Sequence, residues 1–383
     1  MASEITATEE DMKFLHSADW QIGMKALHVD VASSRIREAR IDTAGRVIEV
    51  AKREGAEFIL LAGDTFESNA IDRVAVQRIG DILAHFNGPV YLLPGNHDPI
   101  NVGSVWEHPV WLSHSNIHIL REAQPVKLPS GILYPCPVTS TSAKSKCDPT
   151  GWILPERGSG FRIGVAHGTV EGNPAMEPPL PIPRSAACRA GLDYLALGHW
   201  HSTATYEDSD GVVTMAYSGT HEPTTFGERD SGNVLVIEIS EPLAKPDVRT
   251  IPIGTLRWST IQKTLIGPGQ LRDIRASIEA MPEPASSLIQ IRLNGVLFSA
   301  EFAEIRRIEE ILSARFLHGR LDVTGLGPAP SDDDWVSGLP PGFLRNAAAR
   351  LSELADSNDD ENGRVVAARA LRELYALRKE GAA

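Results

Sequence analysis

The chain has 383 residues, 42% of them hydrophobic and 23% charged, which is typical of a folded protein long enough for more than one domain. Its formal net charge of −13 excludes a generic polyanion binder, because non-specific nucleic-acid affinity needs clustered Lys and Arg. No apolar run approaches the length of a membrane span, and three cysteines without paired spacing indicate free thiols, so we expect a cytoplasmic protein with no membrane partner.

Residues 12–253 alternate strand-like apolar runs with helical patterns, which is typical of a layered α/β domain. Helices are predicted around 33–54 and 72–86, where apolar residues recur at helical spacing. The predicted strands are KFLHSAD, FILLAGD, VYLLPGNHD, FRIGVAHG, LDYLALGHWH, VTMAYSG and NVLVIEI. The first five end in short loops rich in Asp, Asn, His and Gly. Because layered α/β folds bind ligands at the carboxyl ends of their strands, these loops predict one site.

Residues 254–328 predict a small β-α-β-α-β domain without an Asp/His cluster of its own. Its strand, helix, strand, helix and strand are expected at 256–265, 268–282, 286–298, 299–316 and 317–325. The acidic, irregular stretch 329–341 is expected to be a linker. The tail, 342–380, contains two short amphipathic helices at about 343–355 and 363–379. Isolated helices of this length are marginal, so we expect the pair to dock on another surface.

The loops at the predicted strand ends carry the residue types of a two-metal phosphoesterase site. Two divalent ions can orient an in-line attack on phosphorus and stabilise both the attacking and the leaving oxygen. Oxygen donors suit hard ions, and imidazoles add affinity for Mn, Fe or Zn. The candidate ligands are Asp19, Gln21, Asp64, Asn96, His167, His199 and His201. Taken alone, GD is usually a turn and HxH is more often structural, but their ordered combination at five strand ends indicates a site.

The ordered motifs resemble the calcineurin-like metallophosphoesterase superfamily and, within it, the SbcD-type DNA repair exonuclease subunits, bacterial relatives of the meiotic-recombination nuclease. The narrower resemblance is carried by HSADW, LLPGNHDP, GHWHS and YSGTHEPTTFGERDSGNVLVIEI. It implies an α/β fold, a four-layer α-β-β-α metallophosphoesterase sandwich with a small β-α-β-α-β capping domain over the DNA-binding face and a C-terminal helical pair. The implied activity is that of a DNA exonuclease and endonuclease in double-strand break repair or end processing. The implied partners are an SbcC-type coiled-coil ATPase, bound by the helical pair, and a second copy in a homodimer.

The resemblance also implies a role for each motif residue. One ion would be held by Asp19, Asp64 and His201, and the other by Asp64, Asn96, His167 and His199. Mn²⁺ is the expected metal, with Mg²⁺ as the alternative. His97 would stabilise charge near the scissile phosphate and protonate the leaving oxygen, and Asp98 would orient its ring. The sequence contains no Walker A pattern, so any dependence on ATP would come from the partner.

Gln21 departs from the pattern, because close relatives have His at this position. In one interpretation its amide oxygen coordinates the first ion in place of imidazole. In the other, it only forms hydrogen bonds near the site, and the first ion has fewer protein ligands. Either interpretation predicts weaker metal affinity and a shift toward hard ions.

Contacts to the phosphates of DNA are expected from basic side chains outside the ligand set. The candidates are Arg35, Arg37 and Arg40 at the start of the first predicted helix, and Lys144 and Lys146 in a polar loop. Two rival functions stay open at this point. One is a small-molecule phosphodiesterase of the same fold, which would need no docking helices. The other is a DNA-end scaffold with impaired catalysis, which the number of retained ligands makes less favourable.

Overall fold

The computed structural model describes residues 11–26, 29, 32–128, 130–139, 142, 146–155, 160–172, 180–328, 334–356 and 361–380. Lys144 and residues 329–333 of the predicted linker lie outside these residues. The chain divides into two compact units, Met1–Leu256 and Arg257–Ala383. Assignment of the second unit to capping and partner binding stays a prediction.

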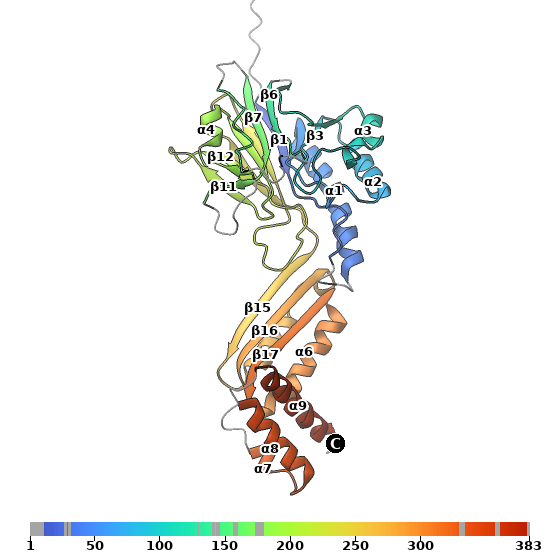
Figure 1. The fold of residues 1–383 in the computed structure, drawn as a ribbon, viewed down its shortest axis with the longest axis vertical. Coiled ribbons are helices and arrows are strands. Elements are labelled where there is room, and N and C mark those ends of the chain that lie inside the picture. The colour runs from blue at the N-terminus through green and yellow to red at the C-terminus, as the bar shows by residue number, and fades with distance from the viewer. Residues whose placement is uncertain are drawn as a thin grey trace, which may run out of the picture. The chain divides into compact units, whose positions relative to one another are not determined.

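Two six-stranded sheets form the centre of the first unit (Figure 1). The first has the order β14 (Asp247–Pro252), β13 (Asn233–Ile239), β1 (Met12–Ser17), β2 (Phe58–Leu61), β3 (Val90–Leu92) and β4 (Ile117–Ile119). The second has the order β11 (Ala204–Glu207), β12 (Val213–Tyr217), β10 (Tyr194–Gly198), β7 (Phe161–His167), β6 (Gly131–Cys136) and β5 (Val126–Lys127). A separate two-stranded sheet pairs β8 (Thr169–Val170) with β9 (Pro181–Ile182).

The two large sheets are each covered by helices on the outer face, which gives the predicted α-β-β-α layers. The first sheet packs against α1 (Ser33–Glu54), α2 (Arg73–Ala84) and α3 (Val110–Ser113), and the second against α4 (Ala186–Ala190) (Figure 1). Alternate residues of β1 contact different layers. Leu15 belongs to the core under the helices, whereas Phe14 packs between the sheets. Phe14 stacks on Phe58 of β2 with ring centroids 4.7 Å apart. Both faces are buried, so the strands are continuous apolar runs rather than alternating ones.

Parallel pairing brings the carboxyl ends of the central strands to one edge of each sheet. β1, β2, β3 and β4 run parallel to one another, and so do β6, β7, β10 and β12. The last residues of neighbouring strands pair in register, Ser17 with Leu61 and His167 with Gly198. The loops that follow these strands therefore emerge together, as predicted.

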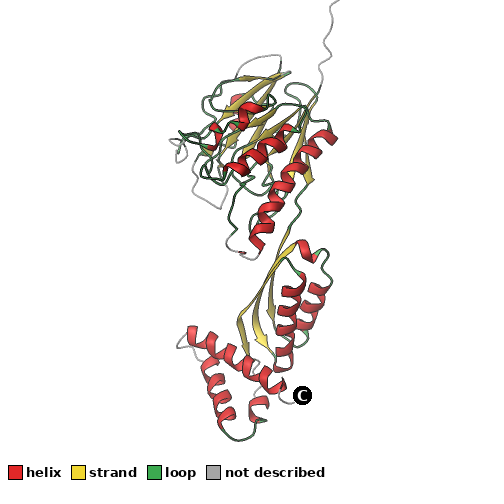
Figure 2. Cartoon of the chain, turned by 90° about the vertical axis from the view of Figure 1, so that its right-hand side faces the viewer, coloured by secondary structure: helices red, strands yellow, loops and turns green. Residues whose placement is uncertain are grey.

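The second unit has a parallel sheet of β15 (Arg257–Leu265), β16 (Ser287–Leu297) and β17 (His318–Pro328). Both α5 (Gln270–Glu279) and α6 (Phe302–Arg315) lie on one face of this sheet (Figure 2). The tail forms α8 (Phe343–Asp356) and α9 (Glu361–Glu380), close to the predicted helices. Short 3-10 turns occur at Val105–Glu107, Pro284–Ser286 and Ser299–Glu301.

Most predicted strands and helices are confirmed, and two expectations are wrong. The predicted linker contains the short helix α7 (Asp334–Ser337), because Trp335 has apolar neighbours in the core of the second unit. Seven strands, β4, β5, β6, β8, β9, β11 and β14, were not predicted, because they are short or are not followed by a loop of Asp, Asn, His and Gly. Among the residues that the structure describes, no helix combines the length and apolar character needed to cross a membrane.

Candidate metal centre

The loops that carry the predicted ligands have an unusual backbone conformation. Asp19, Gln21, Asp64 and His199 have φ values of 54°, 39°, 49° and 106°, in the left-handed region that non-glycine residues rarely adopt. Such conformations cost on the order of 1–3 kcal/mol each and are concentrated at functional sites. The surrounding structure therefore fixes these side chains in positions that a relaxed loop would not give them.

Hydrogen bonds between the β1 and β2 loops hold them side by side beyond the ends of their strands. The backbone N–H of Asp19 donates to the Gly63 carbonyl at 3.1 Å, and that of Gln21 donates to the Asp64 carbonyl at 2.9 Å. Gly95 allows the β3 loop to approach this pair, since a Cβ atom there would collide with the Asp64 carboxylate. PGNHD thus needs a glycine at position 95, because the neighbouring loop leaves no room for a side chain there.

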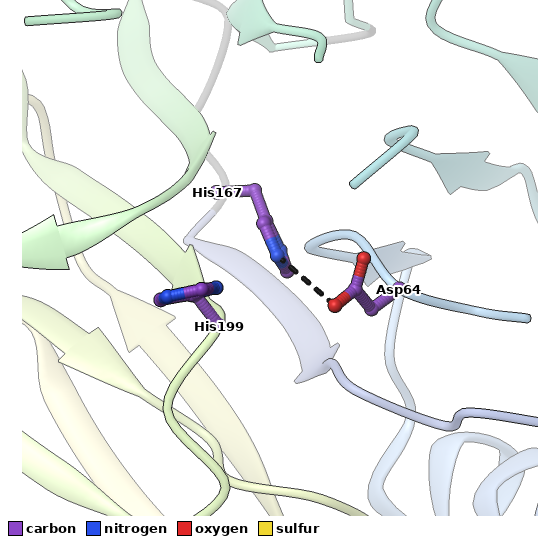
Figure 3. Close-up of side chains that lie close together, drawn as sticks. All are labelled: Asp64, His167 and His199. Carbon is purple, nitrogen blue, oxygen red and sulfur yellow. Dashed lines mark ion pairs between the residues drawn. The ribbon is translucent and has the colours of Figure 1, made fainter. Parts of the chain in front are cut away.

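Asp64, His167 and His199 form the tightest group of metal-ligating side chains among the described residues (Figure 3). One ligand atom from each lies within 4.8 Å of the others, and the Asp64 carboxylate lies 3.3 Å from His167 Nε2. Asn96 completes the group, because its Oδ1 lies 2.9 Å from both His167 Nε2 and His199 Nδ1. These are the four residues predicted to hold the second ion. The structure brings them together at the carboxyl ends of four strands, β2, β3, β7 and β10.

The buried charges of this group perturb each other. Burial raises the pKa of Asp64, but the positive charge of His167 outweighs it, and the net result lowers this pKa to about 2. Burial likewise lowers the pKa of His167, but the Asp64 carboxylate opposes it and raises the pKa to about 9. His167 Nδ1 lies 2.9 Å from the Ala62 carbonyl, which can only accept a hydrogen bond, so Nε2 faces the carboxylate. Nε2 is therefore the ring nitrogen that is available to a cation beside Asp64.

Asp19, Gln21 and His201, expected around the first ion, lie beside this group in a different arrangement. Both Asp19 carboxylate oxygens lie 3.0 Å from the backbone N–H of His199, and burial raises the pKa of Asp19 to about 6. The Gln21 side-chain nitrogen lies 3.1 Å from His201 Nε2. Gln21 therefore contacts the ring nitrogen expected to bind metal, as in the interpretation in which it forms a hydrogen bond near the site.

Glu228 is a residue of this site that the sequence analysis missed. Its Oε1 lies 2.8 Å from His201 Nδ1, and its other oxygen accepts a hydrogen bond from the Thr224 backbone N–H at 2.8 Å. Burial lowers the pKa of His201, but the bond to Glu228 opposes it and the net pKa is raised. A carboxylate behind a histidine in this way fixes the ring and its tautomer. Glu228 lies within the GERD segment that helped to identify the family, but nothing in its spacing marked it.

His97 is half-exposed at the edge of the centre, and the expectation for Asp98 is wrong. His97 Nδ1 lies 3.1 Å from the Glu67 carbonyl, and its Nε2 lies 4.0 Å from Asp64 Oδ2. The buried Asp98 carboxylate instead accepts backbone hydrogen bonds from Phe66 at 2.9 Å and Gly95 at 2.7 Å. Asp98 therefore connects the β2 and β3 loops. The Glu67 carbonyl, and not Asp98, orients the His97 ring.

Arg40 was expected to contact DNA, and the structure corrects this expectation. Its side chain is buried, and its guanidinium donates to the Trp20 and Glu222 carbonyls at 2.8 and 2.6 Å. Arg40 thus stabilises the loop that carries Asp19 and Gln21 from within the protein interior. The other described candidates, Arg35, Arg37 and Lys146, are exposed, as a phosphate contact requires, and Arg35 lies 3.4 Å from Asp42.

The donor set fits divalent metal ions. Asp19 and Asp64 are buried carboxylates within one site, and the charges that lower their pKa values are those of neighbouring histidines. Buried charges of this kind are stable when they are paired or coordinate metals. Carboxylate, amide and imidazole donors together suit ions such as Mn²⁺, which accept both oxygen and nitrogen ligands.

Comparison with known proteins places the chain among phosphoesterases. The sequence pattern of the family described as "Calcineurin-like phosphoesterase" matches residues 12–203, half of the chain. "Uncharacterized metallophosphoesterase YhaO" of Bacillus subtilis is 27% identical over 210 residues, which cover 50% of this chain and 49% of that protein. The solved structure of TT1561 from Thermus thermophilus is 10% identical, with a TM-score of 0.40, and covers 62% of this chain and 98% of that one.

Two shorter similarities involve DNA repair proteins. "DNA double-strand break repair protein Mre11" of Methanococcus maripaludis is 34% identical over 92 residues, 23% of each chain. A subunit of the nuclease SbcCD from Staphylococcus saprophyticus is 30% identical over 102 residues, which cover 25% of this chain and 26% of that protein. The matched regions thus span half or less of the length of these curated relatives.

Proposed function

This chain belongs to the calcineurin-like phosphoesterase family, and we propose that it is a metal-dependent DNA nuclease that hydrolyses phosphodiester bonds as an exonuclease and endonuclease. The observation that carries the hydrolytic part is the convergence of Asp64, Asn96, His167 and His199 on one point. The choice of DNA is supported by the similarity to Mre11 and to the SbcCD nuclease subunit, whose names describe double-strand break repair and a nuclease.

In this proposal the chain would hold two divalent ions, Mn²⁺ or Mg²⁺, and Asp64 would contribute to the binding of both. Asn96, His167 and His199 would hold one ion, and Asp19, His201 and the neighbouring Gln21 would surround the other. When bound, the ions supply the orientation of the attacking water and the stabilisation of charge on both oxygens of the displacement.

The chain's own contribution to the reaction is centred on His97. Its Nδ1 can donate to the Glu67 carbonyl, which leaves Nε2 directed toward the centre, 4.0 Å from Asp64. From this position a protonated ring can stabilise negative charge on the phosphate and donate its proton to the leaving oxygen. The half-exposed position of the ring lets it recover a proton from solvent.

The helical pair is proposed to bind a coiled-coil ATPase of the SbcC type. Apolar side chains of α8 and α9 are exposed at Phe343 (85%), Leu344 (54%) and Val366 (67%). Exposed apolar groups on amphipathic helices are typical of a helix-binding surface. Within the pair, Ala348 and Leu371 belong to the buried core. A homodimer also remains part of the proposal.

One set of assays tests the proposed function. Supercoiled plasmid, end-labelled linear DNA and bis-p-nitrophenyl phosphate would each be incubated with the full chain and Mn²⁺, with His97→Ala as the control. We expect cleavage of all three substrates, lost in the variant. Hydrolysis of the small ester without cleavage of DNA would instead support a small-molecule phosphodiesterase. DNA binding without any hydrolysis would support a scaffold with impaired catalysis.

A further inference from the structure

A pocket of about 1170 Å³ in the first unit is lined by residues of the two loops that also carry Gln21 and Asp64. It lies between the loop that follows β1, the start of α1, and the segment that joins β2 to α2. Its lining includes the aliphatic side chains of Ile22, Met24, Ile41 and Ile71. Ligand pockets of this size are typically apolar with a few polar groups that fix the orientation of the ligand.

The pocket lining includes residues that follow Gln21 and Asp64 in the two ligand loops. Ile22 directly follows Gln21 and donates its backbone N–H to the Thr65 carbonyl at 3.0 Å. Glu67 donates its own N–H to the Ile22 carbonyl at 3.0 Å, and its carbonyl lies 3.1 Å from the His97 ring. Ile22 and Glu67 both line the pocket. Glu67 therefore both lines the pocket and contacts His97, the histidine proposed to act on the leaving oxygen.

Two of the three carboxylates in the pocket lining already have partners. Glu38 forms an ion pair with Arg78 at 2.6 Å, with a second hydrogen bond at 3.2 Å. The carboxylate of Asp72, the N-cap of α2, accepts the backbone N–H of Val74 at 2.9 Å. Glu67 is the remaining carboxylate of the lining.

Two cations of the lining are available for a ligand. Lys25 and Arg37 are exposed, and neither lies within ion-pair distance of a carboxylate in the described part of the chain. The lining as a whole has three carboxylates and two cations, so Lys25 and Arg37 act as individual contacts and not through an overall positive charge. The combination of aliphatic walls with free Lys and Arg groups complements a flat apolar base that is attached to a phosphate.

We infer that this pocket binds the nucleoside next to the scissile phosphate, with its base among the aliphatic side chains and its outer phosphate on Arg37. This inference rests on the proposed function and specifies its substrate as a nucleotide chain. It also gives the site a way to recognise nucleic acid in a protein with a net charge of −13, since binding would not depend on an extended basic surface.

Binding to metal-free protein tests the inference apart from catalysis. A thymidine dinucleotide that carries a phosphate on both its 5′ and its 3′ end, and so has phosphates outside the scissile one, would be titrated calorimetrically into the full chain in EDTA, with thymidine and inorganic phosphate as separate probes. Ala70→Trp fills the pocket from an exposed lining position. The matched control is Val74→Trp, which is 71% exposed on α2 and outside the lining. Arg37→Gln removes the proposed phosphate contact.

We expect the wild type and Val74→Trp to bind the dinucleotide equally, and Ala70→Trp to bind it at least about tenfold more weakly. Arg37→Gln should weaken binding of the dinucleotide but not of thymidine. Equal binding by Ala70→Trp, no binding by the wild type, or binding of inorganic phosphate as tight as that of the dinucleotide would overturn the inference. Hydrolysis of bis-p-nitrophenyl phosphate, measured separately with Mn²⁺, shows whether the proposed function fails instead.

Discussion

The carboxylate of Glu228 lies 2.8 Å from Nδ1 of His201 and therefore sits behind the ring nitrogen that faces the metal centre. Glu228 is itself held by Thr224, whose backbone N–H and hydroxyl both donate to it. Gln21 approaches the opposite side of the same ring at 3.1 Å. The Glu228 contact is the arrangement that tunes metal-binding histidines, and Nε2, beside Gln21, is the nitrogen left for a metal ion.

Glu228→Gln should weaken Mn²⁺ binding by about 10–100-fold, the range typical of changes to such supporting contacts. The neutral amide can still reach the ring, but it lacks the charge that favours the ligating tautomer. Mn²⁺ titrations followed by electron paramagnetic resonance would measure the affinity directly. Glu241→Gln, at an exposed position, is the control. An unchanged Mn²⁺ affinity in Glu228→Gln would show that Glu228 does not support metal binding.

Gln21→His should strengthen Mn²⁺ binding on the order of tenfold, within the range typical of changes around metal ligands. An imidazole at this position adds a nitrogen donor beside His201 and moves the preference away from Mg²⁺. The measurement is the concentration of each metal that gives half-maximal hydrolysis. If the two metal profiles match those of the wild type, Gln21 neither coordinates nor supports the first ion.

His97→Ala should reduce hydrolysis by about 10²–10⁴-fold, the usual contribution of a positioned general acid. Its ring is held by the Glu67 carbonyl and lies outside the group of Asp64, His167 and His199, so Mn²⁺ affinity should not change. Kinetics with bis-p-nitrophenyl phosphate and a parallel Mn²⁺ titration would separate the two effects. A loss of metal affinity that accounts for the loss of rate would assign His97 to metal binding instead.

Arg40→Ala should destabilise the first unit by at least about 3 kcal/mol, because it leaves several buried carbonyls without a hydrogen-bond donor. Arg35→Ala, at an exposed position on the same helix, should change stability by less than about 0.5 kcal/mol. Urea unfolding monitored by circular dichroism would measure both. A stable Arg40→Ala protein that binds DNA more weakly would restore the original expectation of a phosphate contact.

The pH dependence of stability should show the buried His16, whose pKa is lowered to about 3 by burial. The unfolded chain takes up this proton near pH 6.5, so the folded state loses stability as the pH falls below 6.5 toward 3 and keeps it above 6.5. At pH 5 the loss from this residue is on the order of 2 kcal/mol. His16→Gln should show a smaller drop in the free energy of unfolding between pH 7 and 5 than the wild type. An equal drop in both proteins would show that the ring does not titrate in this way.

The sequence by itself determined the layered fold and most residues of the centre, because both leave local signals. Strands buried on both faces must be continuous apolar runs, and a loop of Asp, Asn, His and Gly at the end of such a run has little packing value. FILLAGD and VYLLPGNHD therefore predicted both a strand and a ligand loop. Short strands such as β5, which lack these signals, were missed.

Only the tertiary structure decided the roles that depend on contacts across the chain. Arg40 and Arg37 are three positions apart on one helix, yet one is buried under the β1 loop and the other is exposed at a pocket. Glu228 gained its role from a ring 27 positions earlier in the chain. Charge and residue type are properties of the sequence, but burial and hydrogen-bond partners arise only when distant segments pack together, and these decide what a charged side chain does.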